Sequence, residues 1–175
     1  VMARAMGLPI GAVHLATNAN RTLPDFLASA CYEGRDSVAT MANAMDVGDP
    51  SNAERLRWMH PDIGALRAAV SADTVDDATI AARIREGESR YGQVWCPHTA
   101  CAVEVLQRRR AAGDAAPLCV VATAHPAKFE TVVEPLVGHA VPLPPALAAM
   151  LARPARDEPL AAEYGALRER LLQLP

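Results

Sequence analysis

Apolar side chains recur along the chain in two patterns, and together these predict helices that alternate with short strands. Ile80 and Ile84 lie four residues apart, the spacing of one helix face. The runs 12–17 and 117–123 are instead short and mostly apolar, as in parallel strands that helices cover on both faces. We therefore predict an α/β fold in which an incomplete, open, largely parallel sheet is flanked by helices.

Residues that start or stop helices set the expected boundaries. Gly7 follows the last turn of a helix, prolines stand near the start of two others, and Thr74-x-x-Asp77 resembles a capping box. We predict helices over 2–6, 22–30, 52–60, a stretch from 61, 74–92, 97–110, 127–137, a short stretch near Leu147, and a final segment with Leu160, Tyr164, Leu167 and Leu171 in one apolar stripe. The predicted strands are 12–17, 93–96 and 117–123.

The order of these elements predicts two parts, 1–138 and a tail, 139–175, that ends in the amphipathic helix. The first part divides into a helix end and strand (1–20), a polar loop (31–50), helices (52–92) and a strand–helix–strand–helix stretch (93–138). The loop 31–50 is rich in Gly, Asn, Asp and Ser. Loops of this length in compact domains are often functional.

Composition narrows the classes of function. The 175 residues carry a net charge of -3, so we expect neither nucleic acid nor an anionic membrane as a partner, since both favour a basic surface. No apolar run approaches the ~20 residues that span a bilayer. The start resembles no signal peptide, and Val1 opens within a helical pattern, so we expect the chain to begin inside a longer protein.

The cysteines indicate a reducing compartment. Cys31, Cys96, Cys101 and Cys119 form no CxxC pair, and we expect free thiols and a cytoplasmic location. Cys96 and Cys101 could in principle share a metal with His98. Their spacing matches no zinc signature, and we expect no metal site.

The end of the apolar run 117–123 is the most informative point for chemistry. Ligands of open parallel sheets bind beyond the carboxyl ends of the strands, and Thr123 puts a hydroxyl at such an end. The helix that follows offers free N–H groups. From these residues alone, Thr123 is equally consistent with a hydroxyl that only caps the turn.

Four sequence blocks resemble one family, the threonine synthases. Ala122 to Phe129 reads ATAHPAKF, like the family's block near the C-terminus. The other three occur in the family's order: GLPI with ATNAN (7–10 and 16–20), NAMDVGDPSN (43–52) and PHTA (97–100). The blocks together cover nearly the whole chain, so the match is more specific than any one of them.

The resemblance implies the large domain of a fold-type II pyridoxal-phosphate enzyme. Such an enzyme converts O-phospho-L-homoserine and water to L-threonine and phosphate, and pyridoxal 5'-phosphate serves as the electron sink. In the family, the Schiff-base lysine and the loop that holds the cofactor phosphate lie upstream of the segment matched here. Lys128, the only lysine in the chain, matches the lysine of the C-terminal block instead. We therefore expect no catalytic residue in this segment, and an isolated segment that is inactive.

The resemblance also nominates site residues. Thr123 would be the hydroxyl that donates to the pyridine nitrogen, as a weak acid can do without protonating the ring. Asn43 and Asp46 in the polar loop would line the site, or would satisfy the loop's own backbone. His98 and His125 would contact the site, or would pack at a helix start and stabilise a turn, respectively.

Two other functions are compatible with parts of these patterns. Another fold-type II enzyme, such as a dehydratase, would share the hydroxyl at the strand end but not the NAMDV and AHPAKF blocks together. A non-catalytic binding module could keep the fold and lose the chemistry. The partners expected for the enzyme are the phosphorylated substrate and the N-terminal part of the same protein.

Overall fold

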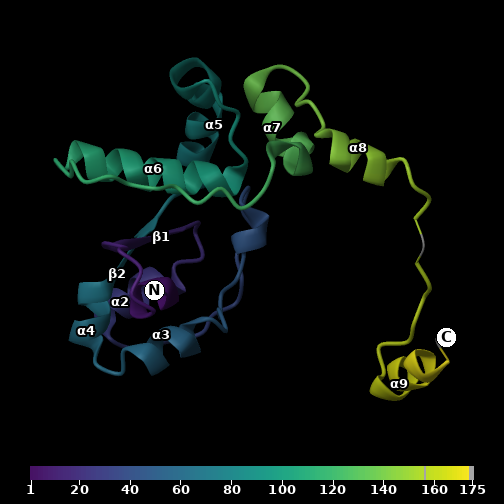
Figure 1. Ribbon diagram of the computed structural model, residues 1–175, viewed down its shortest axis with the longest axis horizontal. Coiled ribbons are helices and arrows are strands. Elements are labelled where there is room, and N and C mark those ends of the chain that lie inside the picture. The colour runs from purple at the N-terminus through teal and green to yellow at the C-terminus, as the bar shows by residue number, and fades with distance from the viewer. Residues whose placement is uncertain (156, 174–175) are drawn as a thin grey trace. The chain divides into compact units, whose positions relative to one another are not determined.

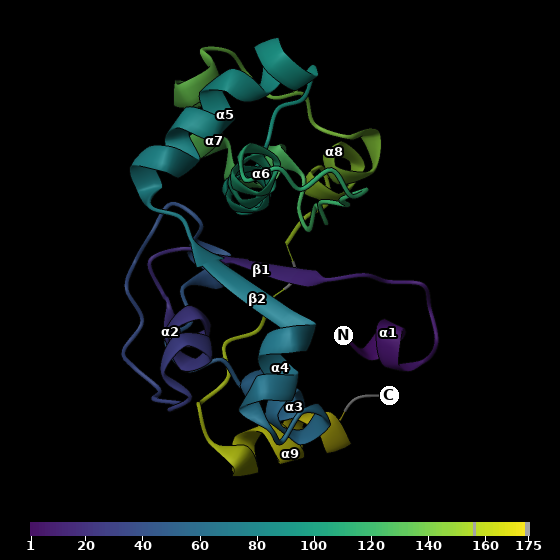
Figure 2. The same cartoon turned by 90° about the vertical axis from the view of Figure 1, so that its left-hand side faces the viewer.

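The computed structural model describes residues 1–155 and 157–173, and the chain forms two compact units, Val1–Val141 and Pro142–Pro175. The first unit contains a two-stranded parallel sheet. β1 (Val13–Thr17) pairs with β2 (Val70–Thr74) in a register that aligns Val13 with Val70. Helices α5 and α6 lie on one face of this sheet and α2, α3 and α4 on the other (Figures 1 and 2). The predicted α/β class with a parallel sheet and flanking helices is confirmed.

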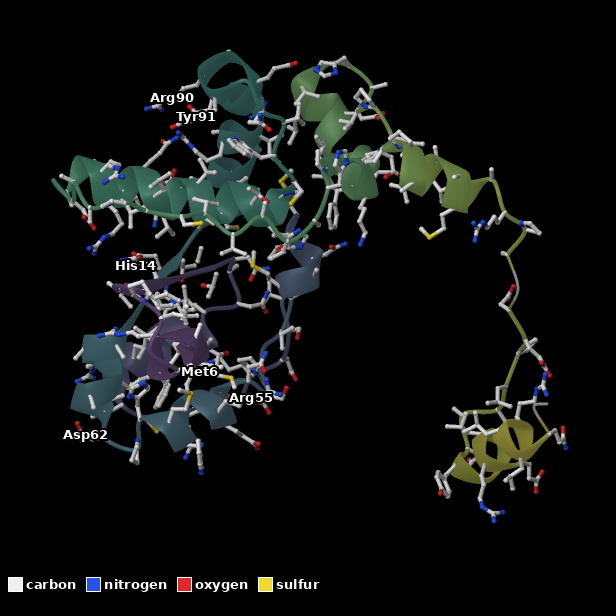
Figure 3. The ribbon with its side chains drawn as sticks, viewed as in Figure 1. Met6, His14, Arg55, Asp62, Arg90 and Tyr91 are labelled. Atoms are coloured by element: carbon white, nitrogen blue, oxygen red, sulfur yellow. The ribbon has the colours of Figure 1, made fainter. Side chains whose placement is uncertain are left out.

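The core below the sheet is built where two helices meet β2. Phe26 of α2 (Thr22–Ser29), Leu66 of α4 (Ile63–Ala69) and Val70 of β2 form a buried cluster. Asp62 caps α4 by accepting a hydrogen bond from the N–H of Ala65 at 2.8 Å (Figure 3). Two shorter helices, α1 (Met2–Ala5) and α3 (Ala53–Met59), complete this part of the unit.

On the other face, α5 (Asp77–Tyr91) packs against α6 (Pro97–Ala111). Ile80 and Ile84 are fully buried there, as their spacing predicted. α5 begins later than predicted: the cap is Asp76, whose carboxylate accepts from the N–H of Thr79 at 2.7 Å. After a 3-10 turn, η2 (Pro126–Phe129), α7 (Glu130–Val137) also contacts α5 and ends at Gly138, which adopts a φ of 82°.

Two predicted strands are wrong, and one strand was not predicted. Residues 93–96 and 117–123 are irregular, and no strand pairs with them within the described residues. β2 was missed because Val70 follows α4 without an intervening turn residue, and Ser71 and Asp73 interrupt its apolar pattern. An apolar run becomes a strand only where a neighbouring strand accepts its hydrogen bonds.

The second unit holds two helices that bury no residue, α8 (Pro145–Leu151) and α9 (Tyr164–Leu172). Both were predicted, but Leu160 of the predicted final helix lies before the start of α9. The predicted apolar stripe does not face a core within this unit, because all four of its side chains are exposed: Leu160, Tyr164, Leu167 and Leu171. Among the described helices of the whole chain, none is both long and apolar enough to cross a bilayer.

Candidate functional site

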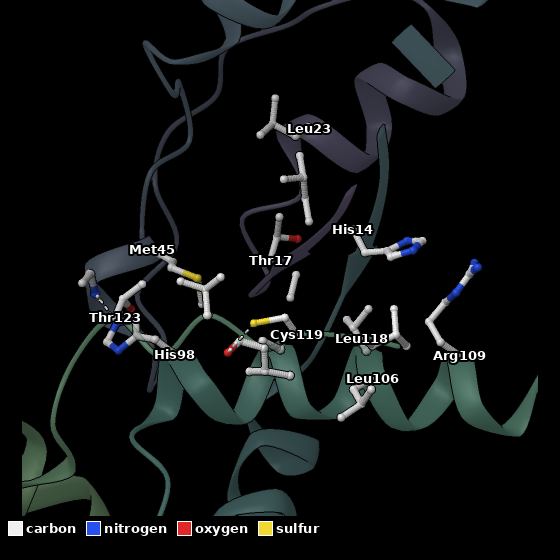
Figure 4. A pocket seen from close by; sticks show the side chains of 17 residues that line it. His14, Thr17, Leu23, Met45, His98, Leu106, Arg109, Leu118, Cys119 and Thr123 are labelled. Carbon is white, nitrogen blue, oxygen red and sulfur yellow. Dashed lines mark hydrogen bonds between the residues drawn. The ribbon is translucent and has the colours of Figure 1, made fainter. Parts of the chain in front are cut away.

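A cavity of about 520 Å³ lies within the first unit, between four segments of chain and Leu23 of α2. Its walls are β1, the 3-10 turn η1 (Asn43–Met45) of the polar loop, one face of α6, and the extended segment 117–123 (Figure 4). Most lining residues are apolar. The polar or ionisable ones are His14, Thr17, His98, Arg109, Cys119 and Thr123. An apolar cavity with few polar groups is typical of sites that bind small molecules.

One end of this cavity gathers the carboxyl ends of two extended segments. β1 ends at Thr17, and the next residue, Asn18, donates to the carboxylate of Asp46 at 2.7 Å. The same loop reaches the start of α6, where the N–H of Ala44 donates to His98 at 3.0 Å. Thr123 lies beside His98 and Met45 at this end (Figure 4). The position agrees with the rule that ligands bind beyond the carboxyl ends of parallel strands.

Thr123 lines the cavity as an exposed side chain, although the strand expected to carry it does not form. Its hydroxyl makes no hydrogen bond to any part of the chain that the structure describes. A hydroxyl without a partner can both donate and accept. Thr123 can therefore donate to an acceptor on a molecule bound in the cavity.

Asp46 anchors the polar loop through a network of hydrogen bonds. Its Oδ1 accepts from Asn18 Nδ2 at 2.7 Å, from Thr40 Oγ1 at 2.7 Å and from Asn20 Nδ2 at 3.2 Å. Its Oδ2 accepts from the backbone N–H of Thr40 at 2.9 Å. Asn18 is fully buried, and buried polar groups need such partners. Asp46 does not line the cavity itself; it holds η1, which does.

His98 links the loop to α6 and is 8% exposed. Its Nε2 accepts from Ala44, so the proton of the neutral ring belongs on Nδ1. Nδ1 is buried and has no hydrogen-bond partner within the described residues. Burial lowers the pKa of His98, and this effect outweighs the negative charge of Asp46, which acts to raise that pKa. The ring also lies 4.7 Å from that of Phe129, centroid to centroid. The neutral His98 ring therefore packs against Phe129 and keeps one donor, Nδ1–H, without a partner among the described residues.

Two other candidates lie outside the cavity lining. Asn43 is exposed, and its backbone carbonyl accepts from the N–H of Asp46 at 3.0 Å. His125 is exposed and caps η2 by accepting from the N–H of Ala127 at 3.2 Å. Of the two roles open to His125, this hydrogen bond corresponds to the one in which it stabilises the turn. Lys128 is exposed on η2 and is also absent from the lining.

Two lining residues were not among the predicted site residues, although a signal existed for each. Thr17 ends β1 as Thr123 ends its segment, so the same rule applies to it; its hydroxyl donates to the carbonyl of Asp73 at 3.3 Å. Arg109 follows His98, Ala102 and Leu106 on one face of α6. Its guanidinium pairs with Asp114 at 2.9 Å, and this hydrogen bond lowers the pKa of that carboxyl group.

Comparisons with known proteins agree on one family. The family described as "Threonine synthase, C-terminal" matches residues 99–170. The threonine synthase of Serratia marcescens is 37% identical over 182 residues, covering 100% of this chain and 40% of the relative. That of Escherichia coli (strain K12) is 32% identical over 179 residues, covering 98% of this chain and 40% of the relative. The chain thus spans about two fifths of the length of these curated relatives.

Solved structures give the same result. The crystal structure of threonine synthase from Escherichia coli matches with a TM-score of 0.75 and 31% identity, covering 98% of this chain and 39% of that one. The structure of pyridoxal-phosphate-bound threonine synthase from Brucella melitensis matches with a TM-score of 0.79 and 29% identity, covering 97% of this chain and 41% of that one. The likeness therefore extends over both sequence and fold.

Proposed function

Because the chain belongs to the threonine synthase family, whose C-terminal part it matches, we propose that it works within an enzyme that makes L-threonine. The reaction converts O-phospho-L-homoserine and water to L-threonine and phosphate, a carbon–oxygen lyase chemistry that depends on pyridoxal 5'-phosphate. The observation that carries the proposal is the free hydroxyl of Thr123. It lies at the end of the cavity where β1 also ends, beside η1 and the start of α6.

The residues present fit the ring of this cofactor. A pyridine nitrogen is an acceptor that needs one donor, and Thr123 offers a donor that no described residue occupies. The surrounding lining is mostly apolar, as a planar ring requires. When bound, pyridoxal phosphate supplies an electron sink for electrons released from the substrate. Thr123 would hold the ring nitrogen, while the Asp46 network and His98 would keep η1 and α6 in place around it.

The residues present do not fit the anchor of the cofactor. Anchoring requires a lysine at the site, and the lining of the cavity contains none. The single lysine of the sequence, Lys128, lies outside the cavity and is exposed. We infer that the anchoring lysine and the phosphate-binding loop come from the part of threonine synthases that this chain does not span. That N-terminal part would be the chain's partner, in the cytoplasm.

The chain alone should therefore form no threonine from O-phospho-L-homoserine, even with added pyridoxal phosphate. Borohydride reduction followed by mass spectrometry should find no cofactor attached at Lys128. Threonine formation by the chain alone, with the label on Lys128, would contradict the assignment of the anchor.

The site assignment is tested by replacing Thr123 in the protein that holds this chain together with the N-terminal part. Thr123→Val keeps the shape and removes the donor, which leaves a buried ring nitrogen unpaired. The cost should be about 1–3 kcal/mol, measured as weaker cofactor binding, slower turnover, or both. Thr123→Ser keeps the hydroxyl and should keep most of the activity. Equal cofactor affinity and turnover in Thr123→Val and the parent protein would contradict the role of this hydroxyl as the donor to the ring nitrogen.

A further inference from the structure

One side chain joins the polar loop to α6, and it is the imidazole of His98. His98 is the second residue of α6, and its Nε2 accepts from the backbone N–H of Ala44 at 3.0 Å. Within the described residues, this is the only hydrogen bond that joins η1 to a segment outside the loop 31–50. Figure 4 shows it as a dashed line at the end of the cavity that holds Thr123. The position of η1 relative to α6 therefore depends on one acceptor atom.

The residues held by this hydrogen bond form a wall of the cavity. Ala44 and Met45 line the cavity from η1, and His98 and Thr123 line it beside them. The network around Asp46 fixes the loop to the end of β1 but does not reach η1 itself. If the hydrogen bond to His98 is lost, η1 can move away from α6, and the wall beside Thr123 moves with it.

Only the neutral imidazole can make this hydrogen bond. Its Nε2 has a lone pair when the proton of the ring is on Nδ1, whereas a protonated imidazole carries a proton on both nitrogens and has no acceptor. Protonation of His98 would turn an N–H on Nε2 toward the N–H of Ala44, so an attraction becomes a repulsion between two donors. Nδ1 is buried without a partner among the described residues and offers the charged ring no new hydrogen bond.

We propose that His98 is a positioning residue: its neutral ring holds η1 against α6, and protonation of the ring releases η1 and opens this wall of the cavity. We call the hydrogen-bonded pair His98–Ala44 the clamp. Its opening should lower turnover in the protein that holds this chain together with the N-terminal part, a consequence that rests on the proposed function. The clamp itself rests only on the contacts of His98 and on the place of η1 in the cavity wall.

The polar groups that act on His98 come from the loop. The carboxylate of Asp46 and the carbonyl of Ala42 act to raise the pKa of His98, and the effect of burial outweighs both. The first turn of α6 carries no acidic residue. η2 contacts the ring through an uncharged phenyl group, and its titratable residues, the capping His125 and Lys128, are exposed.

The lowered pKa sets the pH range in which the clamp opens. Because the pKa of His98 is lower in the folded than in the unfolded chain, the folded chain takes up this proton less readily. The stability contributed by the neutral ring is complete above pH 6.5, the ordinary pKa of histidine, and is lost as the pH falls through the lower folded pKa. The clamp should therefore be closed at about pH 7.5 and open progressively below about pH 6.

Amide hydrogen exchange measured by NMR tests the clamp in this chain. The protection factor of Ala44, which removes the intrinsic dependence of exchange on pH, should fall at least about tenfold between about pH 7.5 and about pH 5. The amide of Ala100, which donates to the carbonyl of Cys96 at 2.9 Å, reports on the start of α6 and should stay protected. The nitrogen shifts of the His98 ring should show the proton on Nδ1 at the higher pH and should titrate together with the protection of Ala44.

Two substitutions separate the acceptor from the charge. His98→Gln keeps an acceptor near the position of Nε2 and does not titrate, so Ala44 should stay protected at both pH values. His98→Phe keeps a ring for packing against Phe129 and removes the acceptor, so Ala44 should exchange at least about tenfold faster at about pH 7.5. The matched control is His125→Asn, because His125 is exposed and likewise accepts a backbone N–H, that of Ala127, at 3.2 Å. This control should leave the pH dependence of Ala44 unchanged.

Turnover in the protein that includes the N-terminal part should fall on the acid side, and His98→Gln should move this acid limb to lower pH by at least about half a unit. Equal protection of Ala44 at the two pH values in the parent chain, or a protected Ala44 in His98→Phe, would overturn the clamp. An acid limb that His98→Gln does not move would overturn its role in turnover. A protein that forms no threonine, with the Ala44 results as expected, would contradict the proposed function and support the clamp.

Discussion

At the residue scale, the carboxylate of Asp46 is held by donors alone. Its four hydrogen bonds come from two side-chain amides, one hydroxyl and one backbone N–H, belonging to Asn18, Asn20 and Thr40. Thr40 Oγ1 cannot easily reverse its role, because it already accepts from Asn18 Nδ2 at 2.8 Å and from the N–H of Ala42 at 3.2 Å. A carboxylate, which only accepts, is therefore the group that this position requires.

Replacing Asp46 with Asn should destabilise the chain by about 1–3 kcal/mol, because either orientation of the amide turns its NH₂ toward a donor. Urea unfolding measured by circular dichroism gives this difference. The backbone amide of Thr40 should also exchange faster, since it loses its acceptor or faces a second donor. Exchange localises the effect to the loop.

Asp36→Asn is the matched control within the same loop. Asp36 is exposed, and its carboxylate has no hydrogen bond or ion pair to the described residues. Its replacement should change the free energy of unfolding by less than about 0.5 kcal/mol, as for most surface positions. Equal effects of the two variants would mean that the Asp46 network does not hold the loop.

At the element scale, the polar loop closes on itself through a contact that admits only glycine. Gly48 is buried, and its N–H donates to Ser37 Oγ at 3.0 Å. Its carbonyl accepts from Thr22 Oγ1 at 2.6 Å and from the N–H of Arg35 at 3.1 Å. A Cβ at this position would lie 2.1 Å from the carbonyl oxygen of Arg35. Because that atom belongs to the backbone, no side-chain rotation relieves the clash.

Gly48→Ala should therefore lower the free energy of unfolding by about 1–3 kcal/mol, the usual cost of overpacking. Gly11→Ala serves as the control, because a Cβ there meets no atom within 4 Å; it should be neutral or slightly stabilising. Chemical unfolding of both variants decides the matter. Equal stability of Gly48→Ala and the parent chain would show that residues 35 and 48 separate in solution.

Helices were predictable from the sequence because their signals are local. Asp62 caps α4, Gly7 and Gly138 take up positive φ angles after α1 and α7, and Pro97 opens α6. Strands depend on a distant partner that no local pattern reveals. The apolar run 117–123 was therefore assigned to a strand that does not pair, while the more polar β2 pairs with β1, more than 50 residues away.

The candidate site was predictable in part for the same reason. Thr123 was found because it follows an apolar run, and it lines the cavity; its role toward the cofactor stays a prediction. The sequence could not separate a direct from an indirect role for Asp46. Its partner Asn18 lies 28 residues away, and only the folded loop places Asp46 behind η1 instead of in the lining.

At the scale of the whole molecule, the two units differ in how their side chains are buried. The unit Val1–Val141 holds the sheet, the cavity and the buried clusters, and its last residue, Val141, is 7% exposed. The N–H of Val141 donates to Glu134 Oε1 at 2.9 Å, which ties this end of the unit to α7. In the second unit, α8 and α9 bury no residue. Its helices therefore contribute little burial to the stability of the chain.

Removing residues 142–175 should accordingly leave the first unit folded, with a free energy of unfolding within about 1 kcal/mol of the full chain. Trp95, half-buried in this unit, reports its unfolding in urea by fluorescence. A second truncation, after Gly138, also removes the buried side chain of Val141 and its hydrogen bond. It should cost a further ~1.5–3 kcal/mol, the value of burying a valine. Equal stability of the two truncated chains would move the boundary to Gly138, where the sequence predicted it; loss of folding in both would mean that the second unit stabilises the first.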